Sequence, residues 1–222
     1  MGLLRRISGL EAAAPFPPSQ EGDLERSCSD DDELLWTAVA RRGIPAKLER
    51  LLLSSTRHGE GTSTVAWRLA LGLARHLGAR VTLVEVATTG VPLTRRLGLP
   101  ATPGFCDLLS GAAQPSGVIC RPTNADVLLV PAGSSSPGTG DLVSPRGREL
   151  LTRLGLERHF LIFDAPPLLL DPAVRPLLTC VDRAVLIARA GQTCIEDALQ
   201  WKREVEHSGI PILGSILNQP RP

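Results

Sequence analysis

Residues 57–64, RHGEGTST, combine two closely spaced glycines with a run of hydroxyl residues. Gly59 and Gly61 permit a tight turn, and a turn of this kind between a strand and a helix directs backbone N–H groups and the positive end of the helix toward a phosphate. Ser63 or Thr64 adds a hydroxyl that can bind Mg²⁺. The segment therefore predicts a loop that surrounds the phosphates of a nucleotide, although a plain strand-to-helix turn is the alternative interpretation.

The loop lacks the lysine that usually stands between the last glycine and the hydroxyl residue, and Thr62 takes its place. That lysine reaches the outer phosphates and balances the charge that develops as a phosphoryl group is transferred. A threonine hydroxyl offers one neutral hydrogen bond, and charge-assisted bonds are roughly twice as strong. The sequence thus indicates a phosphate-shaped loop with a reduced capacity for transfer.

A second candidate for chemistry is Asp164, which ends the apolar run of HFLIFDAPP. A carboxylate at a strand end beside a phosphate loop can hold Mg²⁺ through a water molecule. Ser63 and Asp164 are therefore the predicted magnesium-binding residues, and Asp164 is the one catalytic candidate if the site is active. The alternative interpretation is an acid that caps the turn before Pro166 and Pro167.

The elements that must position these residues alternate between strands and helices. Apolar runs of five to eight residues separated by helical segments are typical of a parallel sheet covered on both faces. Ligands bind such sheets at the carboxyl ends of the strands. The sequence predicts an α/β fold with a mostly parallel, doubly wound sheet. The expected strands are 48–55, 79–86, 125–133, 159–167, 182–190 and 211–218, and the expected helices are 62–78, 92–99, 105–111, 144–157, 171–180 and 194–209.

The first part of the chain differs in composition from the rest. Residues 11–32 are rich in proline, small residues and then acids, with too little apolar surface to offset the entropy of ordering. We expect a flexible tail and linker over 1–32 and one α/β domain over 33–219. A helix is predicted at about 32–42, because three aspartates precede apolar residues at helical spacing.

Charge and composition exclude several classes of protein. The 222 residues carry a formal net charge of +1, which gives no field to attract nucleic acid, and 43% hydrophobic with 21% charged residues is ordinary for a globular protein. No apolar run approaches the ~20 residues of a membrane helix. The five cysteines show no metal-ligand or redox spacing. We therefore expect a cytoplasmic protein with idle thiols.

A family resemblance emerges from several motifs in order. The stretch SSTRHGEGTSTVAWRLALGLARHLGARVTLVEV resembles the nucleotide-binding segment of bacterial tyrosine kinases (BY-kinases), a branch of the deviant P-loop group that includes the MinD and ParA ATPases. The likeness continues in PGFCDLLSG, HFLIFDAPPLLLDPA and GIPILGSILN, and spans about Leu51 to Asn218.

The resemblance implies a P-loop NTPase architecture of the MinD/ParA type with ATP and Mg²⁺ as cofactors. It also implies that the asparagine ending the last strand faces the base. The residues expected to contact the nucleotide are then Gly59, Glu60, Gly61, Thr62, Ser63, Thr64 and Asn218.

The departures from the family pattern fall on charged positions. Besides Thr62 in the loop, the family motif Asp-x-Asp-x-Arg-x-Pro aligns with VEVATTGVP, where Glu85 keeps the first acid while Ala87 and Thr89 replace the second acid and the arginine. Loss of one charge-stabilising donor costs a transfer reaction about 3–4 kcal/mol of barrier. Two such losses predict a rate reduced by several powers of ten.

Two further departures concern assembly and substrate. The family's autokinases phosphorylate a carboxy-terminal tyrosine cluster, and these 222 residues contain no tyrosine. The family also uses a Glu-x-x-Arg-x-x-Arg type helix for ring assembly. If Glu33 is its glutamate, Trp36 and Val39 occupy the arginine positions.

These observations favour a catalytically degenerate BY-kinase-like protein over an enzyme. The resemblance implies a cytoplasmic partner or regulator in capsular or exopolysaccharide biosynthesis and export. A membrane polysaccharide co-polymerase is its expected partner and can hold it at the inner membrane, and a homo-oligomer is left open.

Two alternatives are kept. One is an active tyrosine kinase or ATPase with a rearranged site, in which Arg57, Arg95 or a partner's residue replaces the lysine; the neighbouring Arg96 lies in the same segment as Arg95. The other is a MinD/ParA-like positioning ATPase, which predicts a nucleotide-dependent dimer.

Overall fold

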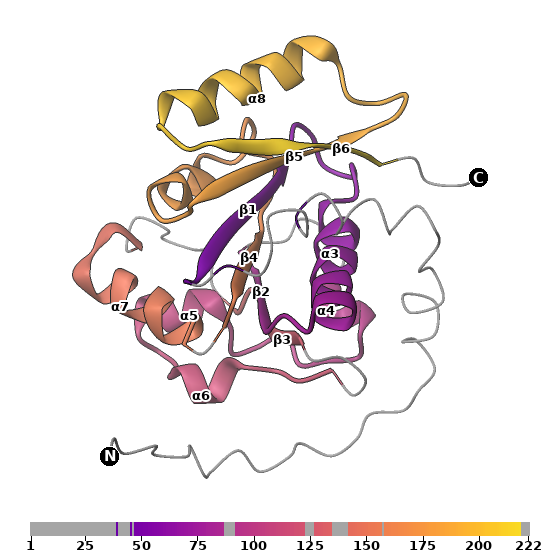
Figure 1. Ribbon diagram of the computed structural model, residues 1–222. Helices are drawn as coiled ribbons and strands as arrows, with labels where there is room; N and C mark the ends of the chain where they lie inside the picture. Colours follow the sequence, from indigo (N-terminus) through magenta and orange to yellow (C-terminus); the bar gives the residue numbers. More distant parts are fainter. Residues whose placement is uncertain are drawn as a thin grey trace.

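Parallel strands alternate with helices in the computed structural model, as Figure 1 shows. The structure describes residues 39, 45, 47–86, 92–122, 127–134, 142–156 and 158–218. Its strands are β1 (Glu49–Ser55), β2 (Val81–Glu85), β3 (Val127–Val130), β4 (Phe160–Asp164), β5 (Arg183–Arg189) and β6 (Ile212–Asn218).

These strands form one sheet in the order β3-β2-β4-β1-β5-β6. Every pairing between neighbours is parallel, with β1 between β4 and β5. The prediction of a doubly wound parallel sheet is therefore confirmed. Since parallel strands share one direction, the carboxyl ends of all the strands lie along the same edge of the sheet, and these include β1, β2, β4, β5 and β6.

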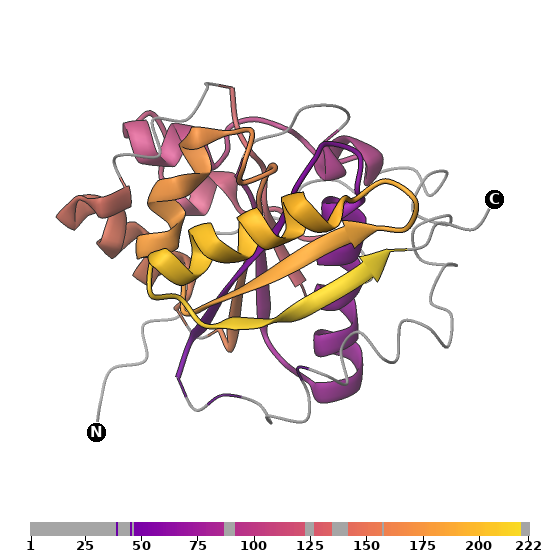
Figure 2. The same cartoon turned by 90° about the horizontal axis from the view of Figure 1, so that it is seen from above.

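Helices cover both faces of the sheet. The described helices are α3 (Thr62–Leu77), α4 (Leu93–Arg96), α5 (Phe105–Ser110), α6 (Pro115–Val118), α7 (Pro145–Leu154), the 3₁₀ helix η2 (Pro172–Thr179) and α8 (Ile195–His207). α3 and α4 share one buried apolar cluster, and α5, α6, α7, η2 and α8 share the other. Figure 2 shows α8 lying along β5 and β6.

The local sequence explains why the two central elements form as they do. β1 carries the apolar run Leu51, Leu52 and Leu53, which is fully buried because both faces of the sheet are covered. α3 buries most of its apolar residues and stops at Gly78, whose φ of +62° favours glycine. The loop of interest connects these two elements.

Two helices add detail to the sequence prediction. The short helix predicted over 171–180 is present and has 3₁₀ geometry over residues 172–179, where Pro176 has no N–H to donate to an α-helical hydrogen bond. The short helix α6 was not predicted. Trp201 of α8 is only 1% exposed because it packs into the core beneath that helix.

Several predictions fall outside the described residues. They include the tail and linker over 1–32, the aligned positions Ala87 and Thr89, and the helix over 32–42 apart from Val39, which is helical and buried. Within the described ranges no helix has the length and hydropathy needed to cross a bilayer.

Candidate functional site

The glycine loop lies at the carboxyl edge of the sheet, between the end of β1 and the start of α3. Gly59 and Gly61 have φ angles of +81° and +92°, a region that suits glycine. α3 begins at Thr62 and has no acidic residue in its first turn. The positive end of this long helix therefore faces the loop without a counter-charge from its own first turn.

Thr62 is the first residue of α3 and its side chain is buried. The structure thus keeps the backbone turn that a phosphate loop requires, with a short uncharged side chain where the lysine would stand. Any positive charge for a phosphate has to come from another element.

Ser63 and Asp164, predicted from separate motifs, are brought together. The Ser63 hydroxyl donates a hydrogen bond to the Asp164 carboxylate at the end of β4. Asp164 is 4% exposed. Burial raises its pKa to about 7; the Ser63 hydrogen bond opposes that shift, the nearby Glu85 adds to it, and Arg96 opposes it.

This pair fits a magnesium ion in chemistry, because Mg²⁺ prefers oxygen ligands and is usually held by one or two protein groups plus phosphate and water. Within the described part of the chain no group of three or more histidine, cysteine or acidic residues could hold a metal. Magnesium bound at Ser63 and Asp164 would therefore depend on phosphate oxygens for further ligands.

Glu85, the acid kept from the second motif, is committed to another task. Its carboxylate is fully buried at the end of β2 and accepts hydrogen bonds from the Leu93 N–H at 2.6 Å and the Thr94 hydroxyl at 2.8 Å. Burial raises its pKa, and these hydrogen bonds oppose the shift. Glu85 therefore fixes the start of α4.

α4 places Arg96, an arginine that the sequence motifs did not single out, beside the glycine loop. Arg96 is partly buried and its Nη1 donates to the Thr64 hydroxyl, 3.1 Å away, in the first turn of α3. The preceding residue, Arg95, is exposed. Helical spacing alone could have suggested that only one of the two adjacent arginines faces α3, since neighbouring residues on a helix point in different directions.

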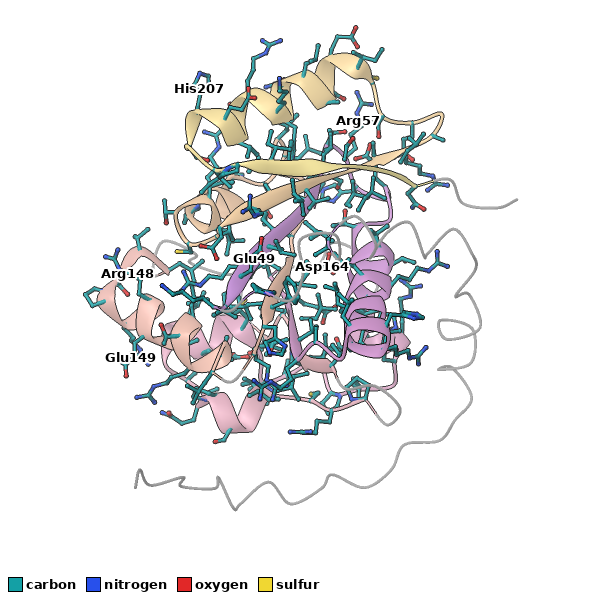
Figure 3. All side chains as sticks on the ribbon, viewed as in Figure 1. Glu49, Arg57, Arg148, Glu149, Asp164 and His207 are labelled. Carbon is teal, nitrogen blue, oxygen red and sulfur yellow. The ribbon has the colours of Figure 1, made fainter. Side chains whose placement is uncertain are left out.

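Arg57, proposed as a substitute for the lysine, is directed elsewhere. Its guanidinium forms an ion pair with Asp197 of α8 at 2.8 Å. Figure 3 shows Arg57 beside α8, whereas Asp164 lies deeper, next to α3. The part of the rearranged-site hypothesis that relies on Arg57 is not supported by this geometry.

The Glu60 side chain is used within the protein. It is 1% exposed, and its carboxylate accepts from the backbone N–H groups of Thr56 at 2.7 Å and Arg57 at 2.9 Å. The Thr193 hydroxyl also donates to it. Glu60 therefore folds the first half of the loop back on itself and can meet a ligand only through its backbone.

Asn218, predicted to face the base, lies against the loop. Its Nδ2 donates to the Glu60 carbonyl at 2.9 Å, across 158 residues of sequence. The contact is tight at Gly61, where a Cβ would lie 2.1 Å from Asn218 Nδ2. The last strand and the loop are thus parts of one site.

The last residue of β5 and the turn after it also hold the loop, which the sequence motifs did not indicate. Arg189 Nη1 donates to the Gly59 carbonyl at 2.8 Å, and Gln192 Nε2 donates to the His58 carbonyl at 3.1 Å. Only the order of strands, which places β5 beside β1, could have revealed this contact. The assembled site has backbone N–H groups, hydroxyls and arginines, a set suited to an anion, together with the buried Asp164 carboxylate that Ser63 holds.

Comparison with known proteins gives the family. No protein-family model matches the sequence. The tyrosine-protein kinase CpsD of Streptococcus agalactiae is 30% identical over 173 residues, which cover 76% of this chain and 74% of CpsD.

Solved structures share the fold. The kinase domain of the Escherichia coli tyrosine kinase ETK superposes with a TM-score of 0.80 at 18% identity, covering 100% of this chain and 86% of that domain. The septum site-determining protein MinD of Pyrococcus horikoshii, solved as a complex with Mg-ADP, gives a TM-score of 0.65 at 22% identity over 78% of this chain and 70% of MinD.

The structure brings the phosphate-shaped loop, the Ser63–Asp164 pair and Asn218 of the last strand together at one edge of the sheet. The similarity to CpsD covers about three quarters of both chains. The chain therefore belongs to the family of bacterial tyrosine-protein kinases.

Proposed function

We propose that this protein is a catalytically degenerate member of its family that acts as a binding partner or regulator in capsular or exopolysaccharide biosynthesis and export. The observation that carries the proposal is Thr62, a buried, uncharged first residue of α3 at the position of the family's loop lysine. Phosphoryl transfer relies on positioned charge, so this site is expected to turn over ATP very slowly.

The position of Glu85 supports the same conclusion. Its carboxylate is occupied by Leu93 and Thr94, so the acid kept from the second motif serves α4 instead of a metal ion or an attacking hydroxyl. Among the described acids at the carboxyl edge of the sheet, Asp164 is then the one left to help bind magnesium. One carboxylate without the lysine leaves developing charge poorly stabilised.

ATP with Mg²⁺ remains the proposed ligand of the loop. Its expected contacts are the backbone of residues 59–62 and the hydroxyls of Ser63 and Thr64, with Asn218 toward the base and Asp164 toward magnesium. When bound, magnesium would supply charge neutralisation between the outer phosphates. The partner we propose is a membrane polysaccharide co-polymerase, which would bring this protein to the inner membrane.

Substitution Thr62→Lys tests the catalytic part of the proposal. ATP hydrolysis by the purified variant is expected to rise at least tenfold over wild type, because the lysine restores charge at the outer phosphates. Thr62→Gln, long but uncharged, is the matched control and should stay near the wild-type rate. A wild-type protein that already hydrolyses ATP as fast as Thr62→Lys would contradict the proposal.

A strain test addresses the regulatory part. A strain that carries Asp164→Asn is expected to make polysaccharide of normal chain length, whereas a strain that lacks the protein should make an altered length distribution, measured by gel electrophoresis. The reason is that a binding role needs the shape of the domain and not its turnover. An Asp164→Asn strain that matches the deletion strain, with normal protein levels, would argue against a non-catalytic role.

A second candidate function is an active kinase or ATPase with a rearranged site, and the contact of Arg96 with Thr64 favours it. It predicts steady phosphorylation of a tyrosine-containing peptide by wild type, abolished in Asp164→Ala. Such a peptide has to be supplied because the 222 residues contain no tyrosine.

A further inference from the structure

Arg96 occupies an electrostatically unusual position. Its guanidinium contacts Thr64 in the first turn of α3, at 3.1 Å, where the helix presents its positive end. That turn contains no acidic residue. A cation at a helix N-terminus is unfavourable, by up to about 1 kcal/mol when exposed, and an anion there is favourable.

Nearby acids do not neutralise this charge directly. Among the described residues no carboxylate lies within ion-pair distance of Arg96. Asp164 interacts with it only through space and is hydrogen-bonded to Ser63, and Glu85 is taken up by the start of α4. Two sources of positive potential, the helix end and the guanidinium, therefore meet beside the loop.

The arginine is held there by its helix. Glu85 fixes the Leu93 and Thr94 end of α4, and Leu93 and Leu97 are buried in the apolar cluster that α3 shares. Anchors before and after Arg96 leave its backbone little freedom, so the side chain is presented toward α3 at low entropic cost on binding. Arg95, on the same short helix, faces solvent.

We propose that Arg96 is the phosphate-binding cation of this site and replaces the lysine absent at Thr62, with Glu85 as its positioning residue. The ligand is the polyphosphate of a nucleoside triphosphate. The inference rests on the proposed function only in taking the glycine loop as the anion site. A guanidinium is always charged and forms paired hydrogen bonds with phosphate oxygens, so it suits recognition.

Isothermal calorimetry with ATP, and separately with inorganic tripolyphosphate, tests the proposal. Wild type is expected to bind both ligands, since the cation recognises phosphate and not the base. Arg96→Ala should weaken binding of both at least tenfold, because a charge-assisted hydrogen bond is lost. Arg96→Lys should recover part of the affinity. Arg95→Ala, which removes the same charge from the exposed neighbour, is the control and should bind as wild type.

The role of Glu85 is tested by non-additivity. Glu85→Gln is expected to weaken ATP binding by loosening α4, and the double variant Glu85→Gln with Arg96→Ala should bind no worse than Arg96→Ala alone. A general loss of stability would instead weaken the double variant further. Circular dichroism melts check that every variant is folded, and Arg96→Lys serves if Arg96→Ala is not.

The outcomes separate this inference from the proposed function. Equal binding by wild type and Arg96→Ala, equal losses in Arg96→Ala and Arg95→Ala, or no binding of either ligand by wild type would each overturn the role of Arg96. None of these results changes the expected slow turnover of ATP or the expected strain phenotype. If wild type hydrolyses ATP fast and Arg96→Ala still weakens ATP binding as expected, the proposed function is wrong and the role of Arg96 in phosphate binding stands.

Discussion

At the scale of single residues, Asp164 and Asp107 are two buried acids with opposite electrostatic settings. Asp164 has a pKa raised to about 7, chiefly because burial disfavours its charged form. The pKa of Asp107 is lowered, first by the hydrogen bond from the Ser134 hydroxyl, with further bonds from the N–H groups of Gly104 and Ser134. One carboxylate destabilises the folded state when ionised, and the other stabilises it.

Substitution Asp164→Asn is predicted to stabilise the protein at alkaline pH. A raised folded-state pKa gives a contribution that is complete below pH 3.8 and is lost as pH rises through about 7. The melting temperature of Asp164→Asn relative to wild type should therefore increase from pH 5 to pH 8, as the free-energy difference between the two proteins grows by about 3 kcal/mol over that range. Thermal melts across that range measure it.

Asp107→Asn provides the opposite sign. Its lowered pKa means that ionised Asp107 stabilises the fold above pH 3.8, with the effect lost as pH falls below it. The variant should melt below wild type at pH 7.

The Asp164 prediction has its own contradicting outcome. An Asp164→Asn variant that melts lower than wild type at pH 8 would show that the ionised Asp164 carboxylate does not destabilise this fold.

At the scale of elements, the glycine loop is held from two sides. β6 contributes Asn218, and β5 with the turn after it contributes Arg189 and Thr193, which bond to consecutive loop residues. The loop conformation is therefore set by strands that follow it by more than a hundred residues, and its rigidity depends on close packing at Gly61.

Comparison of Gly61→Ala with Gly59→Ala isolates that packing. Both glycines have positive φ, so alanine at either position brings backbone strain of about 1 kcal/mol. At Gly61 the new methyl would also meet Asn218, whereas nothing lies within 4 Å at Gly59. Gly61→Ala should lower the free energy of unfolding by at least about 1 kcal/mol more than Gly59→Ala.

Chemical denaturation measures both variants. The additional loss of unfolding free energy in Gly61→Ala should become smaller when Asn218 is also changed to glycine, because the alanine methyl group then has room. Equal destabilisation at the two glycines would mean that Asn218 moves aside freely and that the loop is not clamped.

The elements themselves were largely predictable from the sequence, and the directions of side chains were not. Apolar runs and Gly78 located β1 and α3 because burial and helix ends leave local patterns. Arg57 and Arg96 carry the same charge near the loop, yet one turns to Asp197 and the other to Thr64. That choice depends on which elements become neighbours, and the sequence contains no local record of it.

Glu85 illustrates the same limit at the site. The family motif identified the position, but the carboxylate reaches across a sequence gap of eight residues to the start of α4. A buried acid takes whichever N–H and hydroxyl donors surround it, because an unsatisfied buried carboxylate is costly. Its partners could be found only from the fold.

At the scale of the whole molecule, the two edges of the sheet differ. β3, at one edge, is buried along its length, whereas β6, at the other, is partly exposed throughout. Leu217 of β6 and Ile195 of α8 are among the large apolar residues left exposed. The half of the domain around β5, β6 and α8 therefore has less burial to stabilise it than the centre.

Native-state hydrogen exchange should reveal this gradient. Amides of β1 and β4 are expected to exchange only through global unfolding, and amides of β6 through smaller openings with lower free energy. β3 is the internal comparison, since it is also an edge strand but is buried. Protection in β6 equal to that in β1 would indicate a uniformly cooperative domain.

The bond from Asn218 to the Glu60 carbonyl has a consequence for synthesis on the ribosome. A growing chain makes the glycine loop early, yet the side chain that closes against it emerges more than 150 residues later. Until then the loop lacks its contact with Asn218, and the nascent protein has no complete site in which a cellular nucleotide could bind.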